Sequence, residues 1–131
     1  EGCRVSRLGT TELVSLAEDK LAGKTVDLQC LAQAVEPLFA QQDLDTLVLG
    51  CTHFPLLVPE LEQIAPRKIN WVDSGQAIAR RVDALLPLTS SSEHMLHQAI
   101  LTAEVDQTST LFTSLRRLGF GHSRVWPISA E

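Results

Sequence analysis

The 131-residue sequence predicts an α/β protein in which layers of mainly parallel sheet are flanked by helices. The alternation of two kinds of segment along the chain predicts this class. Short apolar runs, typical of buried strands, alternate along the chain with longer segments whose apolar residues recur at helical spacing. Apolar residues make up 44% of the chain and aromatic residues only 5%, so the core between these layers should be aliphatic.

The first two segments have helical spacing. A helix is predicted over residues 10–22, where Thr10 can cap the start and Gly23 ends the helix. A second helix is predicted over residues 26–40, with Thr25 as its cap. The residues of the second helix expected to face the core are Leu28, Leu31, Val35, Leu38 and Phe39.

Strands and helices alternate after this point. A buried strand is expected over residues 46–49, a helix over 55–65 that stops before Pro66, and a short strand over 69–72. Another helix should run from Ser74, as its cap, to Leu86. The remaining predictions, in chain order, are a loop at 87–93, a strand at 99–103, a helix at 108–118 and a strand at 124–128.

Composition excludes several classes of protein. The net charge of −5 argues against a nucleic-acid partner, and no apolar run is long enough to span a membrane. Three cysteines without CxxC spacing do not predict a disulfide framework or a zinc site, and a reducing cytoplasm fits them best. His94 and His97 lie at helical spacing, but nothing completes a metal site around them. Because the chain begins at Glu1 rather than at methionine, we expect a fragment or a processed product.

One run carries most of the chemistry. Three apolar residues are followed by Gly50, Cys51, and then a proline suited to the first turn of a helix. This order puts Cys51 at the carboxyl end of a strand, where open α/β sheets bind ligands. Exposed backbone N–H groups at that position favour a thiolate over a thiol.

The sequence of this run is Gly50-Cys51-Thr52-His53-Phe54-Pro55-Leu56-Leu57, and it resembles the second cysteine motif of bacterial glutamate racemases. Residues 5–18 and 72–81 resemble the segments that flank this motif in the proteobacterial branch of the family. The resemblance covers residues 4–86 well and the remainder loosely.

The resemblance implies a two-lobed racemase fold with the active site between two similar α/β lobes. Residues 1–72 would then be the second half of the second lobe and would carry the cysteine motif. Residues 73–131 would complete the first lobe. By this likeness the chain is the carboxy-terminal half of an enzyme.

The resemblance also implies a mechanism that uses two cysteines and no cofactor. Cys51 would act as acid or base on one face of the substrate, and its partner would lie upstream of this chain. His53 would hold Cys51 in its reactive state or relay protons, Thr52 would bind the substrate carboxylate, and Glu18 would assist near the cysteine. The alternatives are a helix-capping threonine, a histidine satisfied at a helix start and an exposed glutamate.

The implied activity is interconversion of L- and D-glutamate for peptidoglycan in the cytoplasm. An aspartate racemase is the nearest alternative, and a non-catalytic folded fragment or interaction module is an alternative of another class. A nucleotide-linked muramyl peptide is the expected activator, and a homodimer is left open. Cys3 and Cys30 match no cysteine motif of the family and are interpreted as structural.

Overall fold

The computed structural model describes residues 2–86, 97–106 and 109–126. The chain divides into two compact units, one formed by Glu1–Lys20 with Thr25–Leu88 and the other by Leu21–Lys24 with Thr89–Glu131. No helix in the described part of the chain is long and apolar enough to cross a membrane. The assignment of residues 1–72 and 73–131 to two racemase lobes stays a prediction.

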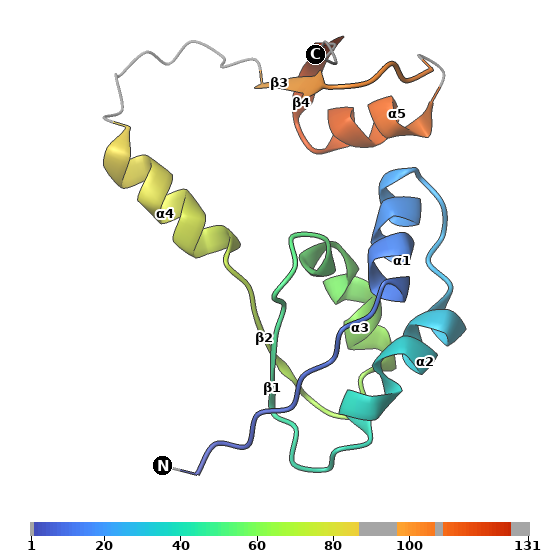
Figure 1. Cartoon of the computed structure of the whole chain (residues 1–131), viewed down its shortest axis with the longest axis vertical. Helices are drawn as coiled ribbons and strands as arrows, with labels where there is room; N and C mark the ends of the chain where they lie inside the picture. Colours follow the sequence, from blue (N-terminus) through green and yellow to red (C-terminus); the bar gives the residue numbers. More distant parts are fainter. Residues whose placement is uncertain (1, 87–96, 107–108, 127–131) are drawn as a thin grey trace, which may run out of the picture. The chain divides into compact units, whose positions relative to one another are not determined.

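The first unit alternates helices with two short parallel strands (Figure 1). Its elements, in order, are α1 (Glu12–Leu21), α2 (Leu28–Phe39), β1 (Thr46–Val48), the 3₁₀ helix η1 (Phe54–Leu57), α3 (Val58–Ile64), β2 (Asn70–Val72) and α4 (Gly75–Leu85). β1 pairs with β2 in register Leu47 to Trp71. The Leu49 N–H extends this ladder by donating to the Val72 carbonyl at 2.8 Å. The predicted α/β class with parallel strands is confirmed.

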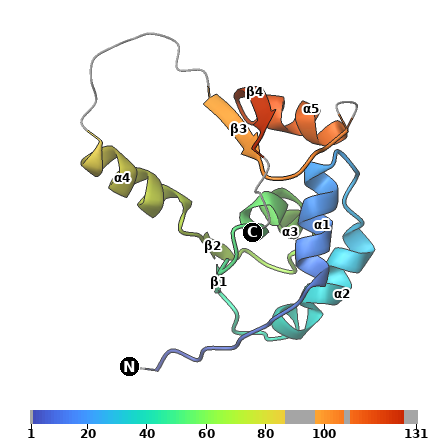
Figure 2. The ribbon, with the colours of Figure 1, turned by 45° about the horizontal axis from the view of Figure 1, so that its top comes forward.

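The core of this unit lies where α1, α2 and α3 pack side by side (Figure 2). α1 contributes Leu16 and the fully buried Ala17, and α2 contributes Leu31. Leu57 and Leu61 come from η1 and α3. These buried side chains are all aliphatic, as the composition predicts.

The start of α2 differs from the prediction. Asp27, not Thr25, caps the helix, because the Asp27 carboxylate accepts the N–H groups of Gln29 and Cys30 at 2.8 and 3.0 Å. Val26 before the cap and Leu31 four positions after it are both buried in the same core, which is the arrangement of a hydrophobic staple. Leu28 was predicted to face inward, but it is 39% exposed because this start turns it away from the core.

The helix predicted over residues 55–65 is instead two helices, η1 and α3. Pro59 lies in the first turn of α3 and has no N–H to continue a ladder from η1, which accounts for the change of helix type. α3 ends at Ile64, and Ala65 is extended before Pro66, as predicted.

α4 matches the predicted helix, but its start does not. Ser74 occupies the cap position without a side-chain hydrogen bond, and Asp73 accepts the Gly75 N–H at 2.6 Å in its place. No residue of α4 is buried. Ile78, Val82 and Leu85 form an apolar stripe that is 49 to 59% exposed.

The second unit contains β3 (His97–Leu101), α5 (Thr110–Arg117) and β4 (Phe120–Val125), and its two strands pair in parallel. Both strands begin earlier than predicted. β4 can start at Phe120 because Gly119, with φ of 95°, ends the helix directly before it. The loop predicted at 87–93 lies outside the described residues.

Leu31→Ala and Leu28→Ala provide a matched test of the α2 boundary. Leu31→Ala removes a fully buried side chain and should lower the free energy of unfolding by about 2–5 kcal/mol. Leu28→Ala should cost less than about 1 kcal/mol, because that side chain already contacts solvent. Urea unfolding followed by circular dichroism measures both. Equal losses would contradict the boundary described here.

Candidate functional site

The candidate site begins where β1 ends. Beyond Leu49 the chain turns, and the Phe54 N–H donates to the Cys51 carbonyl at 3.2 Å while the Leu56 N–H donates to the His53 carbonyl at 3.1 Å. Cys51 therefore follows the carboxyl end of a parallel strand and precedes a helical turn, as predicted. The strand is less buried than predicted, since Val48 is 70% exposed.

Three of the four predicted site residues form one line of contacts. Cys51 Sγ lies 3.5 Å from His53 Nδ1, and His53 Nε2 lies 2.6 Å from Glu18 Oε1. Glu18 comes from α1, whereas the other two residues come from the turn after β1. The fold therefore brings a thiol, an imidazole and a carboxylate together across 35 residues of sequence.

The surroundings of Cys51 favour its thiolate. The backbone N–H of His53 is the largest cause that holds the pKa of the Cys51 thiol below its ordinary value, and the His53 side chain adds to this effect. The charge of His53 and the backbone N–H of Phe54 act in the same direction, while partial burial opposes them. A thiolate, the reactive form of cysteine, is therefore present at lower pH than in a free cysteine.

The surroundings of His53 favour its charged form. The hydrogen bond to Cys51 is the largest cause that raises the pKa of the imidazole, followed by the hydrogen bond to Glu18. Nε2–H then donates to the carboxylate and Nδ1–H to the thiolate. The arrangement can hold a thiolate–imidazolium pair oriented by a carboxylate, which is the geometry of an activated sulfur base or nucleophile.

Thr52 is exposed beside these three residues. Its hydroxyl and backbone N–H are free to face a ligand, but its part in substrate binding stays a prediction. Cys3 is exposed and Cys30 is half-buried against the aliphatic core, so their structural role also stays a prediction. Among residues 2–86, 97–106 and 109–126, no group of three His, Cys, Asp or Glu side chains could hold a metal ion.

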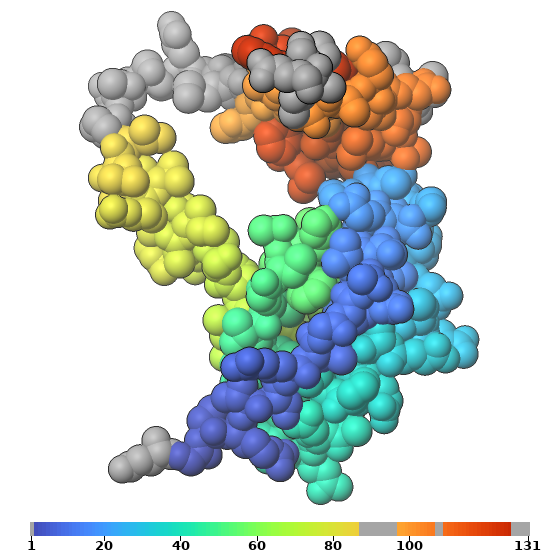
Figure 3. Space-filling view, viewed as in Figure 1, coloured from blue at the N-terminus to red at the C-terminus, as the bar shows by residue number. Residues whose placement is uncertain are grey.

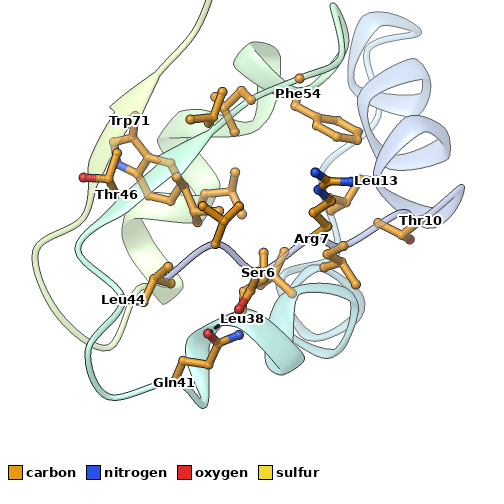
Figure 4. Close-up of a pocket in the computed structure, with 18 of the residues that line it drawn as sticks. Ser6, Arg7, Thr10, Leu13, Leu38, Gln41, Leu44, Thr46, Phe54 and Trp71 are labelled. Atoms are coloured by element: carbon orange, nitrogen blue, oxygen red, sulfur yellow. Dashed lines mark hydrogen bonds between the residues drawn. The ribbon is translucent and has the colours of Figure 1, made fainter. Parts of the chain in front are cut away.

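An apolar cavity of about 680 Å³, which the sequence analysis missed, opens next to the site. Its wall comes from residues 3–10, β1 and the packed helices, and it reaches Cys51 and Phe54 at one end (Figure 4). Figure 3 shows the first of these segments, in dark blue, against the turquoise chain after α2, where Ser6 donates to Gln41 at 2.8 Å. No sequence signal predicted this cavity, because residues 3–10 have neither strand nor helix periodicity. Most of its exposed wall is apolar, but Arg4 and Arg7 also line it.

Comparison with known proteins finds glutamate racemases that are similar to this chain. No family model matches the chain. A glutamate racemase of Vibrio vulnificus is 42% identical over 125 residues, which are 95% of this chain and 47% of that protein. A glutamate racemase of Pasteurella multocida is 54% identical over 84 residues, which are 64% of this chain and 31% of that protein.

This chain is similar in sequence and structure to glutamate racemases. It spans less than half the length of the curated relatives from Vibrio vulnificus and Klebsiella pneumoniae that it matches. The structure of Escherichia coli glutamate racemase, in complex with L-glutamate and the activator UDP-MurNAc-ala, matches 98% of this chain and 49% of its own with a TM-score of 0.85 and 38% identity. The glutamate racemase isoform RacE1 of Bacillus anthracis matches with a TM-score of 0.63 and 27% identity. The predicted resemblance is confirmed.

His53→Ala tests the electrostatic link between His53 and Cys51. The variant removes the imidazole but keeps the backbone N–H of residue 53, so the pH dependence of Cys51 alkylation should move only part of the way toward that of an ordinary cysteine, and toward higher pH. Iodoacetamide labelling across pH, resolved by peptide mass spectrometry, reports Cys51 separately from the exposed Cys3, which is the internal reference. An unmoved Cys51 profile would show that His53 does not support the thiolate.

Proposed function

We propose that the complete protein carrying this chain is a glutamate racemase and that Cys51 is one of its two catalytic thiols. The observation that carries the proposal is the contact line from Cys51 through His53 to Glu18, formed at a strand end in a chain similar to glutamate racemases. The reaction needs a strong, weakly solvated base at the α-carbon, and the geometry supports a thiolate at that point.

The proposed reaction transfers two protons, one on each face of the α-carbon. The Cys51 thiolate takes the α-proton from one face of the amino acid, which leaves a thiol and a carbanion whose charge is shared with the α-carboxylate. A second thiol on the opposite face then donates a proton to the α-carbon, and the inverted amino acid leaves. We expect that second thiol in the half of the racemases that this chain does not match. No cofactor takes part in the proposed reaction.

The neighbours of Cys51 prepare it for this transfer. His53 stabilises the thiolate before proton transfer, and Glu18 fixes the orientation of the imidazole by accepting from Nε2 at 2.6 Å. Thr52, exposed next to the sulfur, would donate its hydroxyl or N–H to the substrate carboxylate. Binding of that carboxylate would also stabilise the charge that develops during deprotonation.

We further propose that the product is D-glutamate for peptidoglycan, made in the cytoplasm, and that the activator bound by the Escherichia coli relative, UDP-MurNAc-ala, also acts on this protein. Aspartate is the competing substrate. A non-catalytic interaction module, with or without homodimerisation, is the competing function, because this chain alone offers one candidate base.

Cys51→Ala tests the catalytic assignment in the complete protein. In D2O the wild type should incorporate deuterium at the α-carbon while converting L- to D-glutamate, and should act far more slowly on aspartate. The variant should lose at least about 100-fold in racemisation, the usual contribution of a positioned acid or base. Chiral chromatography with mass spectrometry measures both quantities.

Cys30→Ala is the matched control, because it removes a half-buried thiol elsewhere in the same unit and should keep racemisation within about 3-fold of wild type, unlike the roughly 100-fold loss at a catalytic base. Wild-type rates from Cys51→Ala would refute the role of this thiol. Faster turnover of aspartate than of glutamate would assign the other substrate. A wild type without exchange of either amino acid would favour the non-catalytic module.

The activator proposal predicts that UDP-MurNAc-ala raises kcat/KM for glutamate by at least about 5-fold, the lower end of common allosteric couplings. The activator should also tighten binding of glutamate, and by linkage glutamate should then tighten binding of the nucleotide by the same factor, which isothermal titration calorimetry measures. UDP alone is the control for the nucleotide part of the molecule. A rate unaffected by the activator would remove this proposal without touching the racemase assignment.

A further inference from the structure

We propose that Lys20 is a positioning residue that holds Glu18 against His53, a role that rests on the proposed function of the Cys51 site. Lys20 lies near the end of α1, two residues after Glu18. Neither the sequence motif nor the contact line at Cys51 includes it. Its contacts nevertheless reach the same segment that carries His53.

The Lys20 ammonium makes two contacts with that segment. Nζ donates to the Leu56 carbonyl at 2.7 Å and to Glu60 Oε2 at 2.7 Å. Pro59, three residues after Leu56, has no N–H to offer this carbonyl in a 3₁₀ pattern, so Lys20 supplies a donor there. The Lys20 and Glu60 side chains are 31% and 18% exposed. Their ion pair is therefore more shielded from solvent than a pair on the surface.

Lys20 lies in line with the buried stripe of α1, which Leu13, Leu16 and Ala17 form, whereas Glu18 lies well to one side of it. With about 100° per residue, Glu18 is rotated about 100° to one side of Ala17, and Lys20 about 60° to the other. Ala17, fully buried at the edge of this stripe next to Glu18, carries only a methyl group. Glu18 and Lys20 both contact the segment 53–60, so the Lys20 contacts restrain a rotation of α1 that would carry Glu18 away from His53.

A rotation of α1 would displace Glu18 in particular. Its side chain is 59% exposed, so packing does not restrain it, and a rotation of α1 would lengthen its 2.6 Å contact with His53. A longer contact would leave the imidazole less well oriented and the Cys51 thiolate less well supported. Lys20 therefore acts on the thiol through α1, Glu18 and His53, without touching Cys51 itself.

The test compares Lys20→Met with Lys20→Arg and Glu60→Gln in the complete protein. Lys20→Met should move the pH profile of Cys51 alkylation toward higher pH and lower kcat for glutamate by about 10-fold, with KM within about 2-fold, as expected for misplacement of a group that acts in the transition state. Glu60→Gln should give the same shift to a smaller extent. Lys20→Arg, which keeps the charge and donors, should recover most of both losses. Lys68→Met, at an exposed lysine of the same unit, should behave as wild type.

A second measurement separates positioning from folding. In a His53→Ala background, Lys20→Met should cause no further shift in the alkylation profile, because its effect passes through the imidazole. A lower melting temperature with an unmoved profile would overturn the proposal, and so would an equal shift in the His53→Ala background. Because alkylation needs no racemisation, a shifted profile in a protein that does not racemise glutamate would keep the role of Lys20 and reject only the proposed function.

Discussion

The contact of the His53 imidazole with groups on both sides is the interaction on which the candidate site depends. One ring nitrogen faces the Cys51 sulfur at 3.5 Å and the other faces the Glu18 carboxylate at 2.6 Å. A ring with partners on both nitrogens has its protonation and orientation set by those partners. The ring therefore links a local turn to a distant helix. The packing of α1 on η1 and α3 matters for the site because it sets the position of Glu18.

The site combines local and long-range causes that can be separated. The lowered pKa of Cys51 has its largest cause in the backbone N–H of His53, which the turn supplies without help from other elements. The raised pKa of His53 depends on Cys51 first and on Glu18 second. Thiolate formation is thus encoded mostly in residues 51–54. The orientation of the imidazole depends on the tertiary fold, because Glu18 lies on α1. Substitutions in α1 would therefore change this orientation.

The same division explains what the sequence predicted. The position of Cys51 after a strand could be predicted, because three apolar residues, Gly50 and Pro55 lie close together in the sequence. Glu18 could be named only through the family resemblance, because its contact with His53 crosses 35 residues. Lys20 was missed because its partners lie 36 and 40 residues away, and no local pattern marks them. The Thr25 cap was wrong because Asp27, two residues later, offers a charged acceptor to the N–H groups of Gln29 and Cys30, so the helix begins after Asp27.

Stereochemistry limits what one such site can do. A single thiol on one face can remove the α-proton and return one from solvent, but it returns that proton to the same face and preserves the configuration. Inversion needs an acid on the opposite face within reach of the same carbon. Cys30 lies half-buried against the aliphatic core, and Cys3 is exposed on the segment before α1. Under the proposed function, Cys51 supplies one of the two acid–base groups that inversion needs, and the second thiol would come from outside the described residues.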